Sequence, residues 1–201
     1  MKKISIVALV LALALLVGCG GTKGGYEPGT LEGDTYTNEY LGYSFTLPDG
    51  WEFATKEELN NMMAAGSEFL NDDQKAAAEY AKLATIYDMV ATSDIGENIT
   101  IMLDNLKFYV GGTATKPETY VNNLKEQLAA VDANGLTYEV GDTYNVNAVG
   151  KDWIVLSAEV PNMGIYQTYS ICRVDNYIVG VIITSSSVIG INDLSDYMKA
   201  I

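Results

Sequence analysis

Carboxylates are the most numerous ionisable side chains of this sequence, and histidine is absent. Its 201 residues include 26 Asp and Glu, 12 Lys and Arg, and no His. The chain therefore lacks the usual general base, the Ser-His-Asp arrangement and most zinc sites. Paired carboxylates could still hydrolyse a glycosidic bond, which requires two acids about 5–10 Å apart, and the candidates are Asp72, Asp73, Asp88, Asp104, Asp152 and Glu159. None of these acids belongs to a recognisable motif, so we predict no catalytic residue and no enzyme.

Metal, phosphate and thiol chemistry also lack a matching pattern. Ca²⁺ needs several oxygen ligands in one loop, and only the stretches 93–98 and 193–196 approach that demand. Gly111-Gly112 precedes an expected helix whose N-terminus could accept an anion, although a plain connection into the helix is the simpler interpretation. Cys172 has no histidine to activate it and lies in an apolar stretch, where a buried small hydrophobe is expected. We predict no metal and no cofactor.

Tyrosine is unusually frequent, with 14 residues against four Phe. Tyrosine suits half-exposed sheet faces and also the surfaces that bind sugars or peptides. Tyr166 and Tyr169 fall on opposite faces of a regular strand and cannot form one platform. A better cluster occurs near the start of the domain, and we name it as the candidate binding surface: Tyr36, Tyr40, Tyr43 and Trp51. The alternative is that these rings pack the first strand and its approach.

The N-terminal segment MKKISIVALVLALALLVGC carries the most specific motif of the chain. Lys2 and Lys3 precede an uncharged apolar run, residues 4–17, which is short against the roughly 20 residues of a membrane-spanning helix and is typical of an export signal. Leu16-Val17-Gly18-Cys19 resembles the lipobox of bacterial lipoproteins. That resemblance implies that diacylglycerol is attached to the Cys19 thiol and that cleavage removes residues 1–18. The alternative is an ordinary secretory signal with a chance cysteine.

Lipidation would place the protein outside the cytoplasm, anchored to the cell membrane. Two acyl chains on Cys19 make a durable anchor. Cleavage removes Lys2 and Lys3, which leaves 10 basic residues against 26 acids and a formal charge near −16. This charge excludes nucleic acid as an expected partner and opposes attraction to anionic headgroups. A cationic partner would be favoured, although a solvated acidic surface is the simpler interpretation.

Composition divides the rest of the chain into a tether and one domain. Residues 20–35, GGTKGGYEPGTLEGDT, contain six glycines and are typical of a flexible tether with a root-mean-square reach of roughly 20–25 Å. The remainder has the length of a single domain with its own core. We predict a signal peptide over 1–18, a lipidated cysteine with its tether over 19–35 and a domain over 36–201.

Periodic apolar residues predict several strands, over 43–47, 51–53, 85–93, 98–106, 137–140, 144–149, 152–160, 165–174 and 177–184. The first two should form a hairpin around the turn at 48–50. The last of these strands is apolar on both faces and should be central in its sheet.

Capping-box spacing predicts two helix starts, at Thr55 with Glu58 and at Thr115 with Glu118. The second of these helices should extend to Val131. Further helices are expected over 71–84 and 192–201. Helices separated by strand hairpins predict an α+β domain around one mainly antiparallel sheet.

The start of the domain also carries a family resemblance. The pattern Asn-x-x-x-Gly-Tyr-Ser-Phe-x-x-Pro-x-Gly-Trp resembles the PsbP/Mog1-like superfamily, and it stands here as Asn38, Gly42, Tyr43, Ser44, Phe45, Pro48, Gly50 and Trp51. The resemblance covers about 36–201 and implies an α/β/α sandwich used for binding and assembly, as in photosystem subunits and a nuclear-transport cofactor. The metal-binding histidines of some relatives have no counterpart here. The chain also resembles small lipoproteins of Gram-positive bacteria that carry this domain, which implies a location at the cell surface.

Three functions remain open from the sequence. The first is a membrane-tethered, non-catalytic binding or assembly module for an envelope protein partner. The second is a lipoprotein that binds a small ligand such as a solute, a glycan or a peptide. The third is a carboxylate-dependent hydrolase. An exposed Tyr and Trp patch would favour the first, a pocket with converging polar groups the second, and two facing acids in a cleft the third.

Overall fold

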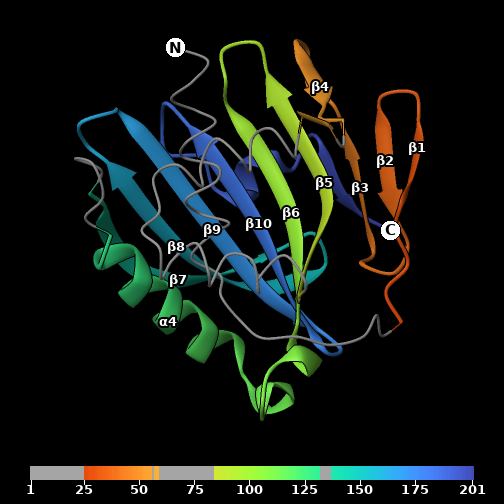
Figure 1. The fold of residues 1–201 in the computed structure, drawn as a ribbon. Coiled ribbons are helices and arrows are strands. Elements are labelled where there is room, and N and C mark those ends of the chain that lie inside the picture. Colours follow the sequence, from red (N-terminus) through yellow and green to blue (C-terminus); the bar gives the residue numbers. More distant parts are fainter. Residues whose placement is uncertain (1–24, 56, 59–83, 132–136) are drawn as a thin grey trace.

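The computed structural model describes residues 25–55, 57–58, 84–131 and 137–201. Within these ranges the chain forms two antiparallel sheets and the helix α4 (Pro117–Ala129), as Figure 1 shows. The small sheet has the order β1-β2-β3-β11, with β1 Thr30–Glu32, β2 Thr35–Asn38, β3 Tyr43–Thr46 and β11 Met198–Ala200. The large sheet has the order β4-β5-β6-β10-β9-β8-β7, with β4 Trp51–Phe53, β5 Thr85–Ser93, β6 Asn98–Asn105, β7 Glu139–Ala148, β8 Lys151–Val160, β9 Ile165–Val174 and β10 Tyr177–Ser185. The expected α+β class is confirmed, with two sheets in place of one.

Two hydrophobic cores lie on opposite faces of the large sheet. On one face α4 packs against β7, β8 and β9 and buries Val121, Leu124 and Leu128. On the other face the small sheet packs through Phe45, which is fully buried, and through Tyr43. Each layer therefore covers apolar surface that the large sheet could not leave in water. The helices expected between 59 and 83 fall outside the described residues.

The position of strand β10 in the large sheet explains why its sequence is apolar on both faces. It is the fourth of seven strands in the large sheet, as expected. Ile178 and Ile182 belong to the core under α4, whereas Val179 and Val181 belong to the core under the small sheet. A strand covered on both sides must be apolar at odd and even positions alike.

The C-terminal segment differs from the expected helix over 192–201. A short 3₁₀ helix, η3 (Ile191–Leu194), is followed by β11, which pairs with β3 through Met198 and Phe45. Met198 is only 3% exposed. Pairing with β3 gives these residues backbone partners and a buried side chain, and this tertiary gain outweighs local helix preference.

The expected hairpin between 43–47 and 51–53 does not form. The turn at 48–50 carries the chain from one sheet to the other, because β4 pairs with β5 in the large sheet, Trp51 opposite Ser93. The strands expected at 137–140 and 144–149 form the single strand β7, which a register shift interrupts between Val140 and Thr143. The strands expected at 85–93 and 98–106 are present as β5 and β6, which form an antiparallel hairpin.

One predicted helix cap is confirmed and the other is wrong. Thr55 donates through its N–H and its hydroxyl to Glu58 Oε2, at 2.8 and 2.7 Å, and Glu58 N–H donates back to Thr55 Oγ1 at 3.2 Å. Helix α4 instead begins after Lys116, without a side-chain cap. Pro117 occupies its first turn, where a fixed φ and a missing N–H are tolerated. None of the helices among the described residues is long and apolar enough to span a membrane.

The packed chain begins earlier than residue 36. The hairpin of β1 and β2 covers 30–38, and Tyr26 makes ring contacts with Tyr40 and Tyr177 at centroid distances of 5.8 and 6.3 Å. The predicted tether over 19–35 is therefore too long, because its second half belongs to the domain. One of its glycines is required by close packing, since a Cβ on Gly29 would lie 2.4 Å from the Thr37 carbonyl oxygen.

Candidate functional site

A buried carboxylate lies where β6 meets α4. Asp104, near the end of β6, is 1% exposed. The chain then turns through two short 3₁₀ helices, η1 (Leu106–Phe108) and η2 (Gly112–Ala114), before α4 begins. Gly111 adopts a left-handed φ of 73° between them, a conformation that glycine reaches without cost. This compact double turn brings Tyr109 back over the end of the sheet.

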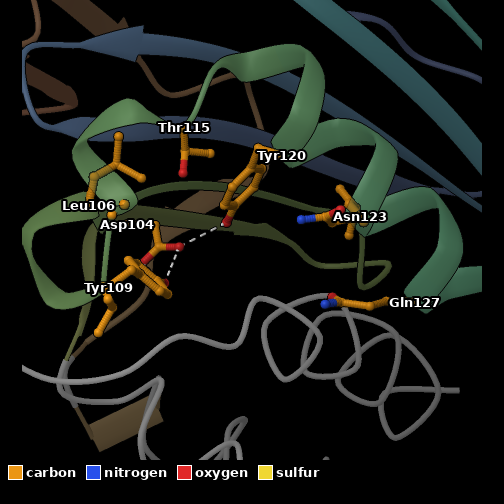
Figure 2. A pocket seen from close by; sticks show the side chains of 11 residues that line it. Asp104, Leu106, Tyr109, Thr115, Tyr120, Asn123 and Gln127 are labelled. Atoms are coloured by element: carbon orange, nitrogen blue, oxygen red, sulfur yellow. Dashed lines mark hydrogen bonds between the residues drawn. The ribbon is translucent and has the colours of Figure 1, made fainter.

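Two phenols hold the Asp104 carboxylate, as Figure 2 shows. The Tyr109 hydroxyl lies 2.5 Å from each of the two carboxylate oxygens, and the Tyr120 hydroxyl donates to Oδ2 at 3.2 Å from α4. Each phenol has one proton to donate, whereas an ionised carboxylate offers about four acceptor positions. Asp104 therefore keeps acceptor capacity that these two residues do not use.

Burial controls the protonation of this group. It raises the pKa of Asp104 to about 6, against 3.8 for an unperturbed Asp, although the hydrogen bonds from Tyr109 and Tyr120 act in the opposite direction. Burial and the neighbouring Asp104 also raise the pKa of both phenols far above 10, so they remain donors. At neutral pH the site holds a carboxylate with a negative charge.

A cavity of about 190 Å³ opens beside this carboxylate. We call it the Asp104 pocket. Figure 2 shows Asn123 and Gln127 reaching from α4 into the same space as Tyr109 and Tyr120. Its described lining is Asp104, Leu106, Tyr109, Val110, Gly111, Gly112, Thr115, Tyr120, Asn123, Leu124 and Gln127. Amides and hydroxyls therefore surround one acid, and the lining described contains no basic side chain.

A second carboxylate, Asp88, has the opposite character. A β-bulge between Tyr87 and Met89 turns Asp88 toward the small sheet. The donors on its carboxylate are the Tyr26 hydroxyl, the Tyr36 hydroxyl at 2.5 Å, the Asn38 amide at 2.8 Å and the Tyr43 hydroxyl at 2.6 Å. We call this group the Asp88 cluster. Three of these donors share Oδ1 and the fourth binds Oδ2, so the cluster ties the small sheet and the segment before it to β5.

The predicted binding surface of Tyr36, Tyr40, Tyr43 and Trp51 is wrong as an exposed platform. Tyr36 and Tyr43 are 9% and 2% exposed and belong to the Asp88 cluster. Tyr40 turns its hydroxyl to Asp175 at 3.1 Å, and Trp51 lies half-buried at the start of β4. Several of the tyrosines therefore serve as partly polar core residues whose hydroxyls donate to carboxylates.

The other predicted residues fall in several places. Cys172 is 4% exposed, and burial raises the pKa of its thiol to about 12, which confirms the buried hydrophobe. Asp88 and Asp104 contact the cores on opposite faces of the large sheet, so they cannot act as a pair. In the described part of the chain no three acids or cysteines gather as metal ligands would. The lipidation residue Cys19 and the pair Asp72 and Asp73 lie outside the described residues.

One feature of the sequence could have identified Asp104, namely its position as an acid within an apolar strand. Alternation alone would place Asp104 on the polar side of its strand, whereas every residue of β6 is buried. A lone acid in such an apolar strand indicates a specific hydrogen-bonding partner, because an unpaired buried charge is very costly.

The raised pKa of Asp104 predicts a pH-dependent stability. The folded state binds this proton more tightly than the unfolded chain, so the added stability is fully present below about pH 4 and is lost as the pH rises through 6. The change should be about 2–3 kcal/mol. Denaturant unfolding of the wild type and of Asp104→Asn at about pH 4, 5, 6 and 7 measures it. The wild type should lose stability relative to the variant as the pH rises, and parallel curves would contradict the assignment.

Comparison with known proteins found no matching family model and no matching curated protein. Among solved structures, the solution structure of cyanobacterial PsbP (CyanoP) from Synechocystis sp. PCC 6803 is similar at a TM-score of 0.46 and 13% sequence identity. The alignment covers 82% of this chain and 85% of that chain.

Proposed function

We propose that the chain is an extracytoplasmic, lipid-anchored binding module whose Asp104 pocket accepts a positively charged group of an envelope protein partner. The observation that carries the proposal is a buried carboxylate beside an open cavity, with acceptor positions that the described residues leave unused. A carboxylate kept from water gains most from a ligand that brings both charge and N–H donors.

The size of the pocket supports recognition of one side chain. Sites for complete small ligands usually measure about 300–1,000 Å³, whereas this cavity measures about 190 Å³. A lysine-like amine with part of its methylene chain is of suitable size. The amide oxygens of Asn123 and Gln127 could accept further N–H groups at the pocket walls.

Charge and location agree with a cationic partner. The pocket lining described carries the single charge of Asp104, and the whole chain has a formal charge of −14. Long-range attraction would therefore bring a basic surface toward the domain and increase its association rate. The apolar run after Lys2 and Lys3 and the lipobox at Cys19 support anchorage outside the cytoplasm.

Thermal unfolding with Nα-acetyl-lysine methylamide tests the pocket. At ten times its dissociation constant a ligand stabilises the folded state by about 1.4 kcal/mol, which should raise Tm by about 3–6 °C. The Nε-acetylated form, which has no charge, should leave Tm unchanged. Below about pH 6 the shift should shrink as Asp104 takes up its proton.

Two variants separate the pocket from general charge attraction. Asp104→Asn keeps the size of the side chain and should abolish the shift, whereas Asp152→Asn removes an exposed acid of β8 that accepts only from Asn147 among the hydrogen bonds described. The second variant should respond like the wild type. A shift that survives in Asp104→Asn, or an equal shift with the acetylated probe, would remove the cationic pocket from the proposal.

A further inference from the structure

The segment that joins the N-terminal region to the domain is bound to the domain at its first described residues. Tyr26 donates its hydroxyl to Asp88, and its ring contacts Tyr40 and Tyr177. The Glu27 carbonyl accepts from Asn38 at 3.4 Å, and Gly29 N–H donates to the Tyr36 hydroxyl at 2.8 Å. Three successive parts of this segment are thus bound to the Asp88 cluster.

Strand β1, which follows this segment, is only weakly fixed to the rest of the domain. All three residues of β1 are exposed, and its pairing in the described part of the chain is with β2 alone. Strand β2, by contrast, has Tyr36 and Asn38 buried and pairs with β3. If Tyr26 left Asp88, and the contacts of Glu27, Gly29 and the exposed strand β1 were released with it, the first held residue would be Thr35 at the start of β2.

We propose that Asp88 and Tyr26 form a latch that sets how far the domain stands from the membrane. The inference rests on the proposed lipid anchor at Cys19. Seven residue steps separate Cys19 from Tyr26, which span at most about 25 Å. Sixteen steps separate Cys19 from Thr35, which span at most about 55 Å. The maximum distance between the anchored Cys19 and the first fixed residue of the domain is therefore about half as long when the latch is closed.

The closed latch also orients the domain. The bilayer that holds Cys19 must lie within that short reach of Tyr26, so the side of the domain that carries Tyr26 and Tyr40 faces the membrane. Asp88 makes this orientation specific, because its carboxylate accepts hydrogen bonds from Tyr26, from Tyr36 of β2 and from Tyr43 of β3. An anchored domain with the latch open could turn its other faces toward the bilayer.

Chymotrypsin release from vesicles tests the latch in the full chain. Full-length protein, expressed in bacterial cells that lipidate it, is reconstituted into phosphatidylcholine vesicles and treated with the protease. A cut after residue 26 frees the domain, and mass spectrometry identifies the cut. Tyr26→Phe keeps the cleavage site and the ring but loses the hydrogen bond to Asp88. It should be cut after residue 26 about tenfold faster than the wild type, a factor that the loss of one charge-assisted hydrogen bond allows.

Tyr40→Phe is the matched control. Its ring also contacts Tyr26, but its hydroxyl donates to Asp175 and not to Asp88. It should be cut at the wild-type rate, and equal rates in all three proteins would overturn the latch. Sedimentation with the vesicles before proteolysis, compared with Cys19→Ser, tests the anchor separately. If the wild type does not sediment with the vesicles, the proposed lipid anchor at Cys19 is wrong. The cleavage rates of the soluble protein then still show whether the hydrogen bond to Asp88 holds Tyr26 in place.

Discussion

Asp88→Ala should lower the free energy of unfolding by about 3 kcal/mol, because loss of the half-buried Asp88 carboxylate leaves buried donors without their partner. The substitution removes the carboxylate to which all four donors of the Asp88 cluster bind. Tyr43 and Asn38, which are 2% and 0% exposed, would keep polar groups in the core with fewer partners. Buried donors without partners cost about 1–3 kcal/mol each. Denaturant unfolding should show the loss, with Tm lowered by more than about 6 °C.

Asp152→Ala is the control for this result. Asp152 is an exposed acid that accepts one described side-chain hydrogen bond, from Asn147 at 2.7 Å. Its removal should change stability by less than about 0.5 kcal/mol. A similar loss in both variants would mean that charge or solubility, rather than the cluster, controls the stability of this chain.

Gly112→Ala should destabilise the fold by about 3 kcal/mol and remove the amine response of the Asp104 pocket. An added Cβ would lie 2.3 Å from the Leu106 carbonyl oxygen and 2.5 Å from Tyr109 Cβ. Backbone cannot yield as a flexible side chain would, so the double turn must open and withdraw Tyr109 from Asp104. Thermal unfolding with and without Nα-acetyl-lysine methylamide measures both effects.

The neighbouring glycine provides the contrast. Gly111 has a φ of 73° and no atom within 4 Å of a built Cβ. Gly111→Asn should cost less than about 1 kcal/mol, because asparagine tolerates the left-handed region, and the amine response should persist. If both variants lose the response, the pocket depends on glycine flexibility and not on the close contact at Gly112.

Local pattern predicted much of the large sheet. Strands β8, β9 and β10 follow one another through short turns and pair with their neighbours in sequence, so alternation and turn residues were sufficient. Strand β11 has three residues, too few to show a period, and its partner β3 lies about 150 residues away in the chain. Strand β4 was assigned to the wrong partner for the same reason. Sequence proximity does not determine which sheet a short strand joins.

Both carboxylate sites depend on departures from regular geometry. Strict alternation places Tyr87 and Met89 on one face, but the bulge at Asp88 divides them between the two cores. The same bulge converts an acid of unassigned role into the centre of four hydrogen bonds. The Asp104 pocket requires the double turn through Gly112, which joins β6 to α4 in a way that composition did not indicate. The residues that line the Asp104 pocket belong to β6, η1, η2, α4 and the turns between them, and only tertiary packing brings them together.

The pairing of β3 with β11 also determines when folding can finish. Phe45 lies opposite Met198 and Tyr43 opposite Ala200, so the small sheet cannot be completed until residue 200 has been synthesised. The central strand β10 likewise comes late, and the earlier hairpin of β5 and β6 must wait for it. Contacts this distant in sequence form slowly. If the chain is exported, it would therefore stay incompletely folded while it crosses the membrane. The small sheet would form only after the C-terminal residues have emerged on the other side.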